Sequence, residues 1–156
     1  MYRTIEDFSK EWHMSSKGTL NVMKAITDDK MDVAIVEGHN SLGWLSWHLV
    51  QVAGAFGQFA GLQIPAPGPE MERPETMQEI IEAYEMVIDA YKKEAASLTN
   101  EELTKMVPAF GGEMPLGQLL RVLIDHQTHH RGQMTVLLRQ AGLPVPPVMG
   151  PTKEMQ

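Results

Sequence analysis

Three histidines, His48, His126 and His130, are the residues of this chain whose type and spacing could do chemistry. His126 and His130 stand four residues apart, which places them about 40° apart on one face of a helix. The same face continues through Leu119, Leu123, Gln133 and Leu137. Because this row is mostly apolar, we expect both imidazoles to point toward the protein interior, where they could share one ion.

His48 belongs to a separate helical segment, in a row with Trp44, Leu45, Val52 and Ala55. Packing alone would favour Leu at this position. A buried imidazole without a partner costs about 1–3 kcal/mol, and a metal shared by three rings removes that cost. We therefore predict one divalent ion held by the three histidines. Zinc and nickel suit such a ligand set, and three protein nitrogens leave a fourth position open for water or substrate.

Other interpretations of these histidines remain open at this point. A lone inward histidine is more often a hydrogen-bonded core residue than a metal ligand. His129 is also spaced to pair with His126, so spacing alone does not choose between His129 and His130. Gln127 stands where the zinc metalloprotease motif has its general-base Glu, which excludes the protease class.

No second catalytic residue stands out. The polar residues near His126 and His130 are Asp125, His129 and Gln133, and none is compelling as an acid or base by type and position. His13 and His39 lie among polar neighbours and are expected at the surface, with His39 near the mouth of the second helical segment.

Four segments with apolar residues at helical spacing must position these side chains, at about 4–27, 40–62, 74–98 and 115–142. Asn40 or Ser41 is the expected N-cap of the second segment. No segment alternates with period two, so we predict an all-α four-helix bundle, with cofactor ligands on facing helices. A single domain covers residues 1–156.

Two connections differ from the rest. The sequence IPAPGPEMERP between the second and third helices contains four prolines, so we expect a long crossover loop over the surface. Between the third and fourth helices, LTNEELTKMVPAFGGEMP combines a capping pattern with Pro and Gly. We predict a short helical turn there, followed by a loop.

Composition narrows the class of partner. The chain has 156 residues, 43% of them hydrophobic, a formal net charge of −7 and no cysteine. Scattered Lys and Arg in an acidic protein argue against nucleic acid and against anionic membranes, and thiolate ligands are excluded. The N-terminal sequence does not resemble a signal peptide, and no stretch is long enough to span a membrane. We therefore expect a cytoplasmic protein acting on small molecules.

The segments NSLGWLSWHLVQVAG, FGGEMPLGQLLRVLIDH and HQTHHRGQMTVLLRQAGLPVPP, in this order, resemble the DinB-like, or YfiT-like, family of proposed metalloenzymes. The resemblance spans nearly the whole chain. It implies an up-down-down-up four-helix bundle, frequent homodimers, and a metal bound by His48, His126 and His130. His129 would then have a neighbouring role.

The resemblance also suggests chemistry, because characterised relatives use low-molecular-weight thiols as S-transferases or as a thiol-dependent isomerase. We therefore expect a metal-dependent transferase or hydrolase acting on a small molecule, with a low-molecular-weight thiol as a further cofactor. The alternative is a non-catalytic, stress-related dimeric binding module in which the metal fastens two helices together. Fold alone does not decide between them.

Overall fold

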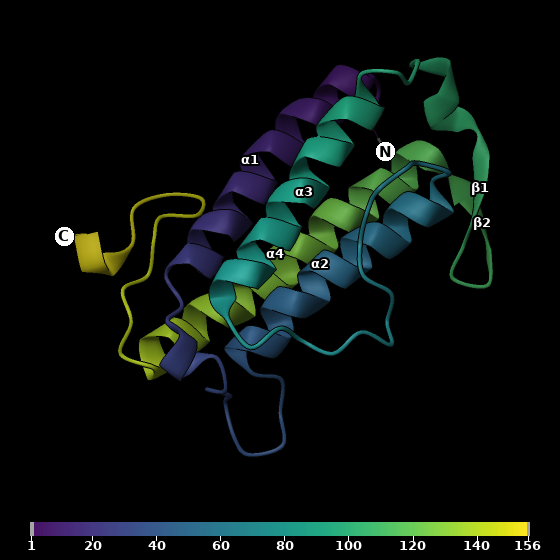
Figure 1. The fold of residues 1–156 in the computed structure, drawn as a ribbon. Helices are drawn as coiled ribbons and strands as arrows, with labels where there is room; N and C mark the ends of the chain where they lie inside the picture. Colours follow the sequence, from purple (N-terminus) through teal and green to yellow (C-terminus); the bar gives the residue numbers. More distant parts are fainter. Residues whose placement is uncertain (1, 156) are drawn as a thin grey trace.

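Four α-helices make up most of the chain, and a computed structural model describes residues 2–155 (Figure 1). They are α1 (Ile5–Lys24), α2 (Leu42–Phe59), α3 (Met77–Ala95) and α4 (Leu116–Gln140). Two short 3-10 helices, η1 (Asp28–Lys30) and η3 (Lys153–Met155), follow α1 and α4. The four predicted helices are confirmed, with each end within three residues of the expected position.

Side-chain caps explain where three of the helices begin. The Thr4 hydroxyl accepts a hydrogen bond from the backbone N–H of Asp7, and the Asp7 carboxylate accepts one from the N–H of Thr4. Ser41, rather than Asn40, caps α2, and Thr76 caps α3. Each cap satisfies backbone donors that the first helical turn leaves without a partner.

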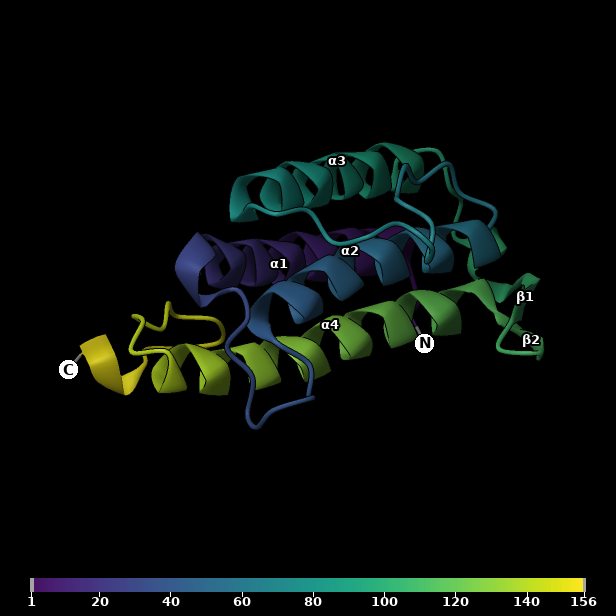
Figure 2. The ribbon, with the colours of Figure 1, turned by 60° about the horizontal axis from the view of Figure 1, so that its bottom comes forward.

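The core lies among all four helices, because α1 and α2 each contact both α3 and α4 (Figures 1 and 2). The apolar stripe of each helix points into this shared space. Among the side chains that are completely excluded from solvent, one from each helix is Phe8, Leu49, Tyr84 and Leu123.

The connection between α2 and α3, residues 60–76, contains no helix or strand and packs onto the side of α2. A Cβ atom at Gly54 would overlap Ala66, and one at Gly57 would overlap Ile64. Glycine at these two positions therefore allows the connecting chain to approach the helix closely.

The segment before α4 corrects the predicted loop. The expected helical turn is present as η2 (Glu101–Thr104), but β1 (Met106–Ala109) and β2 (Gly112–Pro115) then pair antiparallel. Phe110 and Gly111 form the tight turn between them with positive φ angles of 53° and 78°. Proline is tolerated here because both strands of a two-stranded ribbon have an open edge. The protein is thus mostly helical, with one small sheet, rather than all-α.

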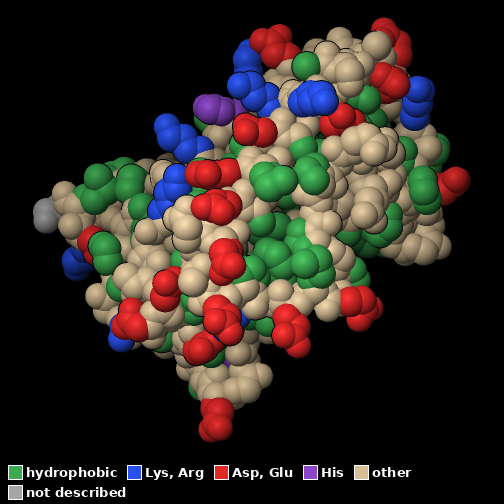
Figure 3. Space-filling model, in the orientation of Figure 1, with side chains coloured by type: hydrophobic (Ala, Val, Ile, Leu, Met, Phe, Trp, Pro, Cys, Tyr) green, Lys and Arg blue, Asp and Glu red, His purple; other side chains and the backbone are tan. Residues whose placement is uncertain are grey.

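The surface is mixed in charge. On the face drawn in Figure 3, Lys and Arg side chains lie mainly toward the top and the left, whereas Asp and Glu predominate in the lower part. None of the helices within residues 2–155 has an apolar stretch long enough to cross a lipid bilayer.

Candidate metal centre

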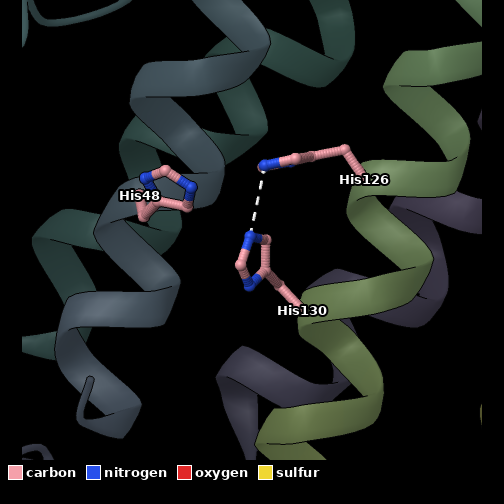
Figure 4. Close-up of side chains that lie close together, drawn as sticks. All are labelled: His48, His126 and His130. Atoms are coloured by element: carbon pink, nitrogen blue, oxygen red, sulfur yellow. Dashed lines mark hydrogen bonds between the residues drawn. The ribbon is translucent and has the colours of Figure 1, made fainter. Parts of the chain in front are cut away.

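The side chains of His48, His126 and His130 meet between α2 and α4 (Figure 4). The ring centroid of His48 lies 5.2 Å from that of His126 and 4.9 Å from that of His130. The centroids of His126 and His130 are 4.5 Å apart. One nitrogen of each ring lies within 4.8 Å of the other two, so the three rings could hold one metal ion. The structure therefore brings together the three histidines singled out in the sequence.

The cluster lies at the side of the bundle, and all three rings are half-buried. The expectation that His126 and His130 point into the core needs this correction. The centre of the α4 inward face is instead occupied by Gln127, which is fully buried, and by Arg131, which is 4% exposed. Gln133, which was expected on the inward row, is exposed.

The buried polar residues next to the cluster have partners of their own. Gln127 Oε1 accepts hydrogen bonds from Thr19 Oγ1 at 3.2 Å and from the Tyr84 hydroxyl at 2.8 Å. Arg131 Nη1 donates to the backbone oxygen of Ser15 at 2.8 Å. Gln127 Nε2 also donates to the backbone oxygen of Leu49 on α2 at 3.4 Å. These bonds join α4 to α1, α2 and α3, so this network has a structural role.

Burial favours the neutral form of the three imidazoles. Loss of solvent, and then the proximity of the His130, His48 and His129 rings, lowers the pKa of His126 to about 4. Burial also lowers the pKa of His48 and of His130. A neutral imidazole carries the lone pair that a metal needs, so these rings are prepared for coordination at pH 7.

Hydrogen bonds orient two of the rings. His130 Nε2 lies 3.2 Å from His126 Nε2, and His130 Nδ1 lies 2.7 Å from Gln133 Oε1. His126 Nδ1 is buried and has no hydrogen-bond partner among the described residues. The nitrogen atoms that face one another are thus the Nε2 atoms of the α4 pair.

Aromatic side chains border the cluster, a role that was not predicted from the sequence. Trp44 stacks on His48 with centroids 4.7 Å apart and planes 14° from parallel. Phe56 lies 6.0 Å from the His126 ring and contacts Phe110 of the hairpin turn at 5.6 Å. The four-residue spacing of Trp44 and His48 was a usable signal, whereas the Phe110 contact depends on the hairpin. Trp44 and Phe56 thus provide apolar contacts on the His48 and His126 sides of the cluster.

The remaining candidates lie outside the cluster. His129 is exposed, and its Nε2 atom lies 3.3 Å from Gln133 Nε2. Asp125 pairs with Arg121 at 2.6 Å. His13 and His39 are exposed, as predicted. The cluster found among residues 2–155 therefore consists of imidazoles alone.

A cavity of about 450 Å³ adjoins His130 through Gln133. Its walls include the apolar side chains of Ile35 and Val136, and its polar lining includes His39 and Asn40. This volume is within the range of small-molecule sites.

Comparison with known proteins places these features in a family. The DinB family model matches residues 1–156. The chain is 36% identical to the uncharacterized protein YrdA of Bacillus subtilis (strain 168) over 155 residues, covering 99% of this chain and 93% of YrdA.

Solved structures agree with the sequence match. A DinB-like protein from Bacillus cereus ATCC 10987 superposes with a TM-score of 0.90 at 36% identity, covering 95% of this chain and 99% of that one. The DinB-like protein YjoA from Bacillus subtilis superposes with a TM-score of 0.73 at 17% identity, covering 93% and 99% of the two chains, which shows a shared fold. Because the family model matches residues 1–156, the chain belongs to the DinB family.

Proposed function

We propose that this protein is a metal-dependent enzyme that transfers a low-molecular-weight thiol to a small electrophile, or hydrolyses a small molecule. His48, His126 and His130 would hold one divalent ion, zinc or nickel. The observation that carries the proposal is the convergence of three neutral imidazoles from two helices, with one nitrogen of each within 4.8 Å of the others.

The donor set fits such an ion. Zinc and nickel bind imidazole nitrogen, and three protein ligands without a carboxylate leave a coordination position for an exogenous group. Lowered pKa values at all three rings keep their lone pairs available at neutral pH. When bound, the ion would supply a positive charge that lowers the pKa of a thiol or a water molecule.

The chain's own residues would orient and shield the reactants. Trp44 and Phe56 border the cluster and would shield one side of a bound reactant from water. The cavity next to Gln133 would take the small-molecule substrate, because its Ile35 and Val136 walls favour an apolar body. Of the candidates Asp125, His129 and Gln133, Asp125 is engaged in an ion pair with Arg121, and the neutral amide of Gln133 is not a base.

The fold and assembly form part of the same proposal. We propose an up-down-down-up bundle in which the proline-rich connection crosses over between α2 and α3, supported by the contacts of α1 and α2 with both α3 and α4. Resemblance to the family supports a cytoplasmic homodimer without nucleic-acid or membrane partners. Light scattering of the purified protein tests the dimer.

A second candidate function is a non-catalytic, stress-related dimeric binding module. Its support is that the three histidines lie on only two helices, α2 and α4, so that an ion would fasten one to the other. In that case the ion would be closed to exogenous ligands, which separates the two candidates experimentally.

Cobalt substitution tests the proposed enzyme. Cobalt-loaded protein is titrated with cysteine as a thiol probe while the visible and near-ultraviolet absorption is recorded. A new sulfur-to-cobalt charge-transfer band supports an open position that accepts thiol. An unchanged spectrum, together with no thiol transfer to an activated aryl chloride, would overturn the transferase and favour the binding module. The His126→Ala variant controls for cobalt bound elsewhere.

A further inference from the structure

The amide of Gln133 lies between two histidines and contacts each with a different atom. Its Oε1 atom lies 2.7 Å from His130 Nδ1, and its Nε2 atom lies 3.3 Å from His129 Nε2. An amide oxygen only accepts hydrogen bonds and an amide nitrogen only donates them. His130 Nδ1 must therefore be the donor in the first contact, and His129 Nε2 the acceptor in the second.

This contact defines the tautomer of His130. A neutral imidazole carries one N–H, and in His130 Gln133 holds that hydrogen on Nδ1. The other nitrogen, Nε2, then presents a lone pair. It is this atom that faces the cluster, 3.2 Å from His126 Nε2. Without the Gln133 contact, the hydrogen could occupy either nitrogen.

His126 lacks such a contact. Its Nδ1 atom is buried without a hydrogen-bond partner among residues 2–155. Since His130 Nε2 carries the lone pair, the 3.2 Å contact requires His126 Nε2–H to be the donor when no cation is present. A cation at the cluster would have to replace this hydrogen, so the two α4 ligands differ in how far they are prepared for coordination.

We propose that Gln133 is a positioning residue that holds His130 in the Nδ1–H tautomer and so presents Nε2 to a divalent cation. His129 assists by accepting a hydrogen bond from the Gln133 amide, which keeps Oε1 turned toward His130. The inference rests on the proposed function only in taking the three histidines as the cation site. Partners of this kind orient metal-binding histidines and raise their basicity.

Nitrogen-15 NMR of the metal-free protein tests the tautomer directly. We expect a pyrrole-type signal for His130 Nδ1 and a pyridine-type signal for Nε2 in the wild type. The Gln133→Met variant, which keeps the length of the side chain without its acceptor, should show both tautomers. A wild-type His130 with its hydrogen on Nε2 would overturn the inference, whatever the protein does with metals.

Zinc affinity, measured by competition with a chelator, gives the second readout. We expect Gln133→Met to weaken zinc binding by about 10-fold or more, and Gln133→Glu to bind at least as tightly as the wild type because a carboxylate is an acceptor only. The Val136→Glu variant adds the same charge at an exposed position one turn further along α4. It is the matched control for electrostatic attraction.

The outcomes separate the two proposals. Equal zinc affinity in wild type and Gln133→Met, or equal tightening by Val136→Glu and Gln133→Glu, would overturn the positioning role. A wild type that binds no zinc would instead overturn the proposed function, while the NMR signals still decide the tautomer. Thermal unfolding of each variant shows whether it is folded. Because Gln133 is exposed, we expect its substitutions to leave the fold intact.

Discussion

The Nε2 atoms of His126 and His130 lie 3.2 Å apart, one helical turn from each other on α4. Both side chains face His48 on α2, so three imidazole nitrogens surround one small volume. Two neutral rings at this distance share one hydrogen, and a cation between them would be bound by both lone pairs. We therefore expect the behaviour of the site, with and without a cation, to depend on this contact.

Removing a ligand should remove the metal. Protein purified without chelator is expected to carry about one divalent ion per chain, and His48→Ala or His126→Ala should lose most of it. Elemental analysis by mass spectrometry measures the content. His13→Ala changes an exposed histidine on α1 and should leave the content unchanged. Full metal content in both ligand variants would contradict the assignment of the site.

Metal affinity should fall in acid. The cluster must be deprotonated to bind, and its pKa values are lowered from the usual 6.5, to about 4 at His126. Affinity should therefore remain nearly constant above pH 7 and decline as the pH falls through the range from about 6 to 4, where the rings gain protons. Competition titrations with zinc at several pH values check this. Equal affinity at pH 8 and pH 4 would be incompatible with imidazole ligands.

The metal-free protein should also become less stable as the pH falls. Because the folded-state pKa of His126 is depressed, the unfolded chain binds more protons below the ordinary pKa of 6.5. The free energy of unfolding is thus highest above pH 6.5 and decreases as the pH drops toward 4. Urea unfolding of wild type and His126→Leu should show a smaller decrease for the variant. Parallel pH profiles would argue against burial of a neutral His126.

Replacing His126 by Leu should have different effects with and without metal. Without metal, the variant loses a buried nitrogen that has no partner and also the Nε2 contact with His130, so its free energy of unfolding should stay within about 1 kcal/mol of the wild type. Zinc at 100 times its dissociation constant should stabilise the wild type by about 2.7 kcal/mol and the variant hardly at all. Thermal unfolding with and without zinc measures both effects.

Two glycines offer a matched test of packing. Gly57→Ala places a Cβ atom against Ile64 of the α2–α3 connection, and Gly132→Ala on α4 meets nothing within 4 Å. Overpacking costs about 1–3 kcal/mol, which exceeds the gain of up to about 1 kcal/mol from better helix propensity. Gly57→Ala should therefore lower the melting temperature and Gly132→Ala raise it. An increase for both would mean that the connection moves away freely.

The helices were predictable because each has a long apolar stripe and clear end signals, such as Ser41 before α2 and Gly142 after α4. The hairpin was not, because its strands have four residues each and include Pro108 and Pro115. Short strands carry too few residues to establish an alternating pattern, and the turn at Phe110 adopts a positive φ that only neighbouring structure explains.

For the site, spacing along one helix identified His126 and His130 as a pair but did not predict how deeply they are buried. His126 and His130 share a face at any rotation of α4, whereas their half-burial depends on how α4 is rotated against α2. That rotation is a property of packing between helices. The choice between His129 and His130 has the same origin, since it requires the position of His48.

Two polar pairs lie side by side on α4, namely the buried Gln127 and Arg131 and the half-buried His126 and His130. Gln127 and Arg131 each follow a histidine of the cluster by one residue, about 100° further around the helix axis, and their buried hydrogen bonds hold α4 against α1 and α3. The buried pair therefore fixes the rotation of α4 about its axis, and this rotation determines where the two histidines point. A substitution at Gln127 or Arg131 would therefore change the distances between the three imidazoles, although neither residue belongs to the cluster.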